Sequence, residues 1–303
     1  MIPLRDIRKR IRSVEKISQI TKAMKTVAAI RLMKVQSQVL KQKPYATKIR
    51  EIVGDLVART PANIHPMLVS GPSLNNNNLE PEQYKKRSRP LIIAFVLGSD
   101  RGLCGSFNNN LVSEVQRFLG SNKNAEVKLV VIGKKLRDLL RARDREIFLE
   151  KINFYHNITF DKVTELSQKF LKEYKNGKID ELVAIYTEFR TTAKQKVTTE
   201  ALLPIGIKKI SAEPLFPTYL YEPDAFTVLD SLLPMYYDRE VWRIFLESVA
   251  SEYMARMIAM DMATINGKEM IDELTLTYNK ARQESITREL SEISTAAEAF
   301  RAR

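Results

Sequence analysis

Residues 1–43 read MIPLRDIRKRIRSVEKISQITKAMKTVAAIRLMKVQSQVLKQK, a stretch without glycine or an internal proline beyond Pro3. Apolar residues recur in it at steps of three or four, the spacing of one face of an α-helix. The flanking positions are mostly Lys, Arg, Ser, Gln and Thr, so the apolar stripe is narrow. A narrow stripe is typical of a coiled-coil seam rather than of a helix buried in a globular core. The stripe consists of Ile7, Ile11, Val14, Ile17, Ile20, Met24, Val27, Val35 and Val39.

The other end of the chain carries a second long helical pattern. Residues 236–303 contain no proline and a single glycine, Gly267, while apolar residues recur at helical spacing from Val241 to Ala297. A helix of 60 residues is about 90 Å long, far more than the diameter of a small domain. Two such helices can bury their stripes only against each other. The sequence therefore predicts an antiparallel coiled coil made of residues 1–59 and 236–303.

Residues 91–215 follow a different pattern. Short, continuous apolar runs at 91–97, 127–132 and 182–186 are typical of buried parallel strands. Helical patterns lie between and beside them, and strand–helix alternation indicates an α/β domain. We expect a small Rossmann-like domain with a mostly parallel sheet, inserted between the two coiled-coil helices. The helical patterns lie near 109–120, 134–144 and 161–177.

Two segments connect these parts. Residues 60–90 contain prolines and a run of four asparagines, Asn75–Asn78, which predicts a loop-rich connector. Residues 216–235 carry Pro217, Pro223 and Pro234 and are predicted to be irregular. Only 10 of the 303 residues are glycine, which favours long uninterrupted elements.

Charge is distributed unevenly along the chain. The whole sequence has 49 Lys+Arg against 36 Asp+Glu, a net charge of +13. The first 59 residues hold 15 and 4 of these, a net of +11. Nucleic acid, a membrane surface or acidic protein loops could each complement such a helix. Residues 1–44 lack any aromatic side chain that could stack on a base, so a protein with acidic loops is the sharper expectation.

Few residues offer catalytic chemistry. The segment Gly98-Ser-Asp-Arg-Gly-Leu-Cys-Gly105 lies between a strand and a helix but matches no phosphate-loop pattern, so we interpret it as a structural turn. Cys104 could be a nucleophile, but only His65 and His156 could serve as its base, and neither lies in a catalytic pattern. One cysteine and two histidines exclude an internal disulfide and a Cys/His zinc cluster. We expect no catalytic, cofactor or metal site, no membrane-spanning helix and no secretory signal.

Four motifs in order resemble the gamma subunit of F-type ATP synthases. They are Ile20-Thr-Lys-Ala-Met-Lys-Thr-Val-Ala-Ala29, Ser99-Asp-Arg-Gly-Leu-Cys-Gly105, Tyr219-Leu-Tyr-Glu-Pro-Asp224, and Tyr278-Asn-Lys-Ala-Arg-Gln-Glu-Ser-Ile-Thr287 with Glu289-Leu-Ser-Glu292. Their order and spacing match from end to end, so the resemblance covers nearly the whole chain. It departs at Ala296-Ala297, where the family usually has Gly-Ala.

The resemblance implies a non-catalytic rotor shaft without a cofactor. Its coiled coil would stand inside a ring of alpha and beta subunits, and its α/β domain would contact the epsilon subunit and the membrane c ring. Such a protein would be peripheral on the cytoplasmic face of a bacterial inner membrane, or on the matrix or stromal side in an organelle. The alternative is a basic coiled-coil protein that binds nucleic acid or serves as a scaffold.

By resemblance, particular residues are expected to make these contacts. The expected contacts with beta are Met24, Arg256, Arg282, Gln283 and Thr287, and the expected contacts with epsilon and the c ring are Tyr219, Tyr221 and Glu222.

Overall fold

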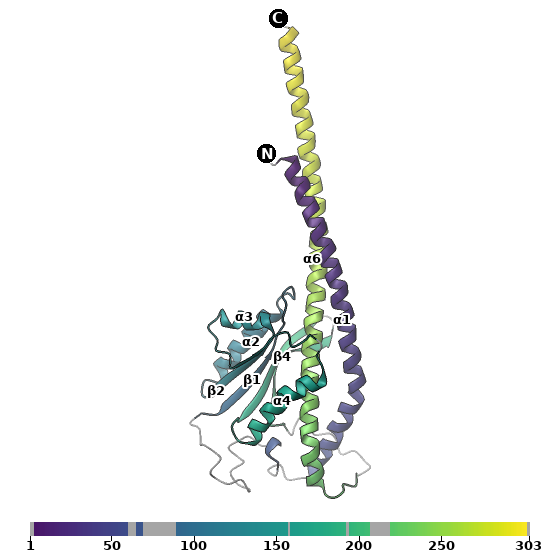
Figure 1. Ribbon diagram of the computed structural model, residues 1–303. Helices are drawn as coiled ribbons and strands as arrows, with labels where there is room; N and C mark the ends of the chain where they lie inside the picture. Colours follow the sequence, from purple (N-terminus) through teal and green to yellow (C-terminus); the bar gives the residue numbers. More distant parts are fainter. Residues whose placement is uncertain are drawn as a thin grey trace. The chain divides into compact units, whose positions relative to one another are not determined.

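A computed structural model describes residues 3–59, 65–68, 89–156, 158–191, 194–206 and 219–301. The chain forms two compact units (Figure 1). Unit 1 contains residues 1–29 and 256–303, and unit 2 contains residues 30–255. The helices α1 (Leu4–Arg59) and α6 (Ala225–Arg301) contribute residues to both units. Most of the connector predicted at 60–90, including its asparagine run, lies outside the described residues.

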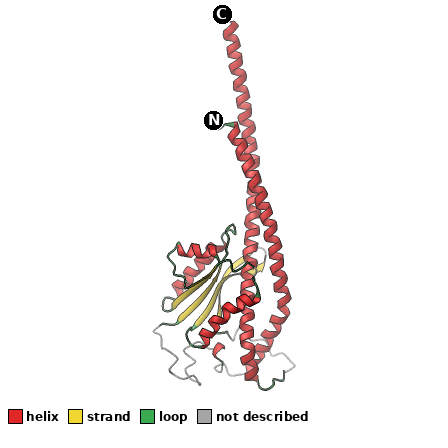
Figure 2. Cartoon of the chain, viewed as in Figure 1, coloured by secondary structure: helices red, strands yellow, loops and turns green. Residues whose placement is uncertain are grey.

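Unit 2 contains the predicted α/β domain. Strands and helices alternate as β1 (Leu91–Leu97), α2 (Phe107–Ser121), β2 (Glu126–Ile132), α3 (Lys134–Arg141), β3 (Leu149–Lys151), α4 (Phe160–Lys175), β4 (Glu181–Thr191) and β5 (Lys194–Leu203) (Figure 2). The strand order is β3-β2-β1-β4-β5. The first four strands are parallel, and β5 pairs antiparallel with β4. The expected Rossmann-like domain is confirmed, with an antiparallel strand at one edge.

Two strands of this sheet were absent from the sequence prediction. β3 has three residues, LEK, which is too short to produce a hydrophobic signal. β5 reads KQKVTTEALL, whose polar residues belong to an edge strand with one face in water. These two strands are stabilised by their backbone pairing with β2 and β4 rather than by a hydrophobic pattern of their own.

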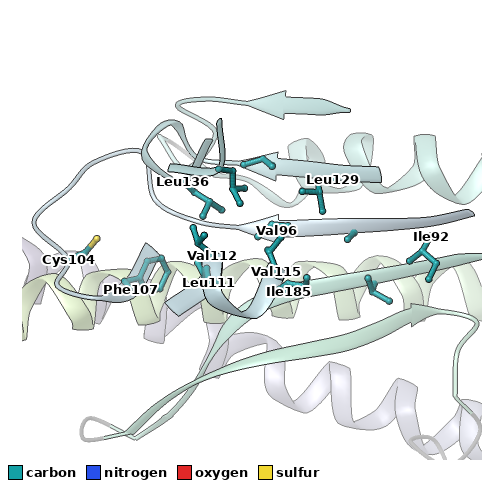
Figure 3. Close-up of a cluster of buried hydrophobic side chains, with 14 residues drawn as sticks. Ile92, Val96, Cys104, Phe107, Leu111, Val112, Val115, Leu129, Leu136 and Ile185 are labelled. Carbon is teal, nitrogen blue, oxygen red and sulfur yellow. The ribbon is translucent and has the colours of Figure 1, made fainter. Parts of the chain in front are cut away.

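The sheet is covered on both faces, since alternate residues of a strand point to opposite sides. Figure 3 shows the core on the α2 side, where Ile92 and Val96 of β1 pack with Leu111 and Val115. On the opposite face Phe95 meets Phe170 of α4 edge to face, with ring centroids 5.0 Å apart. All seven residues of β1 are buried, which explains why its sequence is continuously apolar.

Unit 1 is an antiparallel pair formed by the start of α1 and the end of α6. Thr21 contacts Thr264, and Lys25 contacts Asp261. A later residue of α1 thus contacts an earlier residue of α6, as in an antiparallel pair. Farther along, Arg8 donates a hydrogen bond of 2.8 Å to the hydroxyl of Tyr278. The predicted coiled coil is confirmed in this unit.

The seam of unit 1 differs from the predicted stripe. Ile17, Ile20 and Val27 are 56%, 58% and 50% exposed, whereas Thr21 and Ala28 are buried. The reason is geometric: a helix turns about 100° per residue, so consecutive steps of three rotate a stripe away from the partner. A seam alternates steps of three and four, and the α1 seam does so at Ile7, Ile11, Val14, Ser18, Thr21, Lys25 and Ala28.

Both long helices continue through a proline. α1 includes Pro44, and α6 begins at Ala225 and includes Pro234. The helix predicted from residue 236 therefore starts eleven residues earlier, and only residues 219–224 of the predicted irregular segment are non-helical among those described. A proline inside a helix costs about 3 kcal/mol. Burial of Leu229 and Leu233, both 0% exposed, offsets that cost in α6.

Candidate functional site

The segment Gly98–Gly105 forms a tightly packed turn at the end of β1. A Cβ added to Gly98 would lie 2.3 Å from Cβ of Leu136, so only glycine fits there. Asp100 Oδ1 accepts hydrogen bonds from the backbone N–H of Lys134, at 3.0 Å, and of Asn153, at 2.8 Å. Asp100 thereby connects the loops that follow β1, β2 and β3. These contacts support the interpretation as a structural turn.

Cys104 belongs to the core of the α/β domain. It is 3% exposed and lies at one end of the cluster drawn in Figure 3. Its Sγ accepts a hydrogen bond from Nδ2 of Asn108 at 3.4 Å. The same Asn108 side chain binds Ser99 through both of its polar atoms. Both ring nitrogens of His65 are engaged elsewhere, Nδ1 by the N–H of Met67 and Nε2 by Asp230. A buried thiol in this network is structural rather than nucleophilic.

Unit 1 presents an unusually apolar surface. Among its described residues, nine large apolar side chains on the two helices are 49% or more exposed, and a monomeric protein rarely exposes so many in one region. Three of the side chains, Ile17, Ile20 and Val27, are the α1 residues rotated out of the seam. The others on α6 are Met262, Met270, Leu276, Ile286, Leu290 and Ile293, which are 49% or more exposed. Such a surface indicates a protein partner that encloses the coiled coil.

The end of α6 extends past the start of α1. Arg8 contacts Tyr278, and α1 begins only four residues before Arg8, at Leu4. The α6 residues from Ile286 onward therefore have no residue of α1 opposite them within the described chain. Ile286, Leu290 and Ile293 are 49%, 62% and 66% exposed for this reason.

The five expected beta contacts have different environments. Arg282, Gln283 and Thr287 lie exposed on the end of α6, and the Thr287 hydroxyl donates to the Gln283 carbonyl at 2.9 Å. Met24 is half-buried on α1. Arg256 is only 8% exposed, so its guanidinium lies within the packing of the chain itself. Three of the five thus form an exposed group, and Arg256 stands apart from it.

The loop before α6 is held against α1 within unit 2. The hydroxyl of Tyr221 donates to Asp55 at 2.6 Å, and the ammonium of Lys48 lies 5.4 Å from the ring centroid of Tyr219. These contacts leave Leu220 87% exposed and Glu222 exposed. A leucine so exposed on an anchored loop indicates a contact surface.

The structure also shows a partly buried ionic network that the sequence analysis missed. The guanidinium of Arg243 binds Glu240, Glu247 and Glu200, at 2.9, 2.9 and 3.0 Å. Burial alone would lower the pKa of Arg243, but the carboxylates of Glu240 and Glu247 outweigh it and the pKa is raised. Burial raises the pKa of Glu247. The spacing of Glu240, Arg243 and Glu247 on one helical face was the available signal.

Comparisons with known proteins match this chain over nearly its whole length. A family model described as ATP synthase matches residues 3–300. The ATP synthase gamma chain of Chlorobaculum tepidum is 35% identical over 306 residues, which cover 99% of this chain and 100% of that protein. The ATP synthase gamma chain of an Anaeromyxobacter species is 39% identical, with coverage of 99% and 100%.

Solved structures show the same fold at lower identity. A chain of the Euglena gracilis mitochondrial ATP synthase, in a structure of OSCP, F1 and c ring, aligns with a TM-score of 0.64 and 20% identity, covering 99% of this chain and 95% of that one. A chain from the central stalk and c ring of the Tetrahymena thermophila mitochondrial ATP synthase aligns with a TM-score of 0.56 and 22% identity, covering 80% and 99%.

Proposed function

This chain belongs to the family of ATP synthase gamma chains, and we propose that it is the central-stalk rotor subunit of that complex. In this role it transmits rotation between the membrane c ring and the catalytic ring of alpha and beta subunits. Rotation couples ion movement to ATP synthesis or hydrolysis. The chain itself is non-catalytic, because ATP is made and hydrolysed on beta.

One observation carries this proposal: a coiled coil that leaves large apolar side chains in contact with water. Within a ring of alpha and beta subunits, Ile286, Leu290 and Ile293 would be covered by the wall of the central cavity. Methionine side chains such as Met262 and Met270 repack easily, which suits a surface that must meet successive partners as it turns. The comparisons support this function and not the alternative of a nucleic-acid-binding protein.

To transmit torque, the coiled coil must make contacts with beta that change with its rotation angle. Arg282, Gln283 and Thr287 are exposed on one segment of α6, and an arginine there can form charge-assisted hydrogen bonds with carboxylates of beta. Met24 would contact beta from the α1 side. Arg256 is buried, so we propose that it acts on beta by fixing the helix surface around it rather than through an exposed charge.

The loop before α6 is the proposed contact with epsilon and the c ring. Tyr219 and Tyr221 are held by Lys48 and Asp55 of α1, which fixes the loop so that it presents Glu222 and Leu220 outward. Because the loop is anchored to α1, it can transmit force from the c ring to the coiled coil. An unanchored loop would change conformation under the same force.

The chain would attach to the membrane through this loop and its partners. In the described part of the chain, no helix has the length and apolar character needed to cross a bilayer. We propose a peripheral position on the cytoplasmic face of a bacterial inner membrane, or on the matrix or stromal side in an organelle.

Co-purification tests the function directly. A tagged full-length chain should bring down alpha, beta and epsilon subunits, together with ATP hydrolysis that the purified chain alone lacks. Recovery of the chain without any of these subunits, or ATP hydrolysis by the chain alone, would contradict the proposal. Cys104→Ser in the complex should leave turnover nearly normal, and a complete loss of turnover would instead support a nucleophilic role for Cys104.

A further inference from the structure

A cavity of about 210 Å³ lies inside unit 2, where three segments of the chain meet. One wall is a single face of α1, with residues at spacings of three and four from Arg31 to Gln38. A second wall is α6, and the third is the segment between β3 and α4. The lining residues are Arg31, Lys34, Val35, Gln38, Tyr155, His156, Ile158, Val249 and Tyr253.

The cavity has an apolar floor and a basic rim. Val35 and Val249 are buried at 6% and 1% exposure, whereas Arg31, Lys34 and His156 are exposed. None of the nine described lining residues carries a carboxylate, so the positive charge at the rim is not neutralised from within the cavity. Clefts lined by one sign of charge concentrate ions of the opposite sign.

One basic group is already held in place. The guanidinium carbon of Arg31 lies 5.9 Å from the ring centroid of Tyr253, which also lines the cavity. A guanidinium resting over an aromatic face loses less conformational freedom when it binds a ligand.

The lining also contains a buried hydrogen-bond donor. Tyr155 is 8% exposed, and its buried hydroxyl lies within hydrogen-bonding reach of Ser248. Burial, followed by the charge of the buried Glu252, raises the pKa of Tyr155 well above its usual value, so the phenol keeps its proton. A phenol that keeps its proton can donate a hydrogen bond to an acceptor oxygen of a ligand.

We propose that this cavity binds a small phosphate-type oxyanion. Arg31 and Lys34 would supply the opposing charge, and Gln38, Tyr155 and His156 would supply further hydrogen-bond donors. A water molecule needs roughly 10–15 Å³ of cavity volume, so a cavity of about 210 Å³ has room for a phosphate group together with several waters. Because α1, α6 and the segment after β3 all contribute, the bound ion would stabilise their packing against one another.

Titration of the purified full-length chain with inorganic phosphate tests the proposal. The chain alone avoids interference from the nucleotide sites of the assembled complex. Calorimetry at constant ionic strength should give saturable binding at one site, and phosphate should raise the melting temperature while an equal ionic strength of chloride does not. Parallel titrations with ADP and ATP distinguish free phosphate from a nucleotide phosphate, since tighter nucleotide binding would identify the latter as the source.

Matched variants locate the site. Arg31→Gln with Lys34→Gln should weaken phosphate binding about tenfold or more, since hydrogen bonds to charged groups are among the strongest. Lys22→Gln with Lys41→Gln removes the same charge from exposed positions of α1 outside the cavity and should leave binding unchanged. Tyr155→Phe, which removes only the hydroxyl, should weaken binding several-fold. Equal loss in both charge variants, unchanged binding in Tyr155→Phe, or no saturable binding of phosphate, ADP or ATP would overturn the proposal.

Discussion

The hydroxyl oxygens of Thr21 and Thr264 lie 2.8 Å apart and form a buried polar contact in the coiled-coil seam of unit 1. Each is also within reach of a backbone carbonyl of its own helix, Ser18 at 3.0 Å and Met260 at 2.8 Å. A buried polar layer in a coiled-coil seam favours the register that pairs its members. This contact therefore sets which residues of α1 and α6 face each other.

A double-mutant cycle tests the threonine pair. Thr21→Val and Thr264→Val should each lower the free energy of unfolding by about 1 kcal/mol, because each leaves the other hydroxyl with one fewer partner. The double variant should lose less than the sum, with a coupling energy of about 0.5–1.5 kcal/mol. Urea denaturation of the full chain, followed by circular dichroism, measures all four proteins, and strict additivity would contradict the interaction.

Replacing Gly267 with a slightly larger residue should stabilise the folded chain. An added Cβ would lie 3.4 Å from Cβ of Ser18 and 4.0 Å from Cγ1 of Val14, which are ordinary contact distances. Alanine favours a helix interior over glycine by about 1 kcal/mol. Gly267→Ala should therefore raise the melting temperature of the full chain. Gly267→Leu is the matched variant, because its longer side chain must displace Ser18 and should lower the melting temperature.

His65 should make stability depend on pH near neutrality. Burial lowers the pKa of His65 below 6.5, and this effect outweighs its contact with Asp230. The unfolded chain therefore binds a proton at a higher pH than the folded chain, so stability is full above about pH 6.5 and falls as the pH drops toward the folded pKa. Urea midpoints at pH 7.5 and 6.0 measure the fall.

Variants of the two histidines assign this pH dependence. His65→Gln should reduce the difference between the two midpoints, because glutamine does not titrate. His156→Gln is the control, since His156 is exposed, and it should keep the difference. An undiminished difference in His65→Gln would assign the pH dependence to other groups.

Arg282 tests the proposed coupling surface. Arg282→Ala should lower ATP turnover of the assembled complex several-fold while the amount of complex recovered stays nearly the same, because the side chain is exposed and supports no packing of its own chain. Lys280→Ala removes a charge from an exposed position two residues away, on a different face of the helix. Equal loss of turnover and assembly in Arg282→Ala, or equal effects of the two variants, would remove the coupling role.

Leu220 tests the membrane-facing loop. Leu220→Asp places a charge where an 87% exposed leucine is expected to be covered by a partner, so the complex should lose attachment to the membrane sector. ATP hydrolysis by the detached catalytic part should persist. Leu103→Asp is the control: Leu103 is 61% exposed, and its φ of 61° suits aspartate better than leucine. Membrane attachment retained in Leu220→Asp would exclude this loop from the interface.

The candidate site was predictable from sequence to different degrees. Arg282, Gln283 and Thr287 were predicted by resemblance, and their exposure fits that prediction without testing their role. Arg256 was predicted in the same way, yet its burial could not be foreseen, because a helical pattern does not say which face meets the rest of the chain. The cavity at Tyr155 combines residues from three distant segments, and no single stretch of sequence carries its signal.

Local pattern alone was enough for the long helices, the first buried strands and the turn at Gly98, since spacing and residue type govern each of them within a few residues. Tertiary packing decided the rest. It turned Ile17 and Ile20 outward while Ser18 and Thr21 took the seam, because the heptad phase belongs to the pair of helices and not to either one. It also kept α6 helical through Pro234. Burial of Leu229 and Leu233 offsets the free-energy cost of a proline inside a helix.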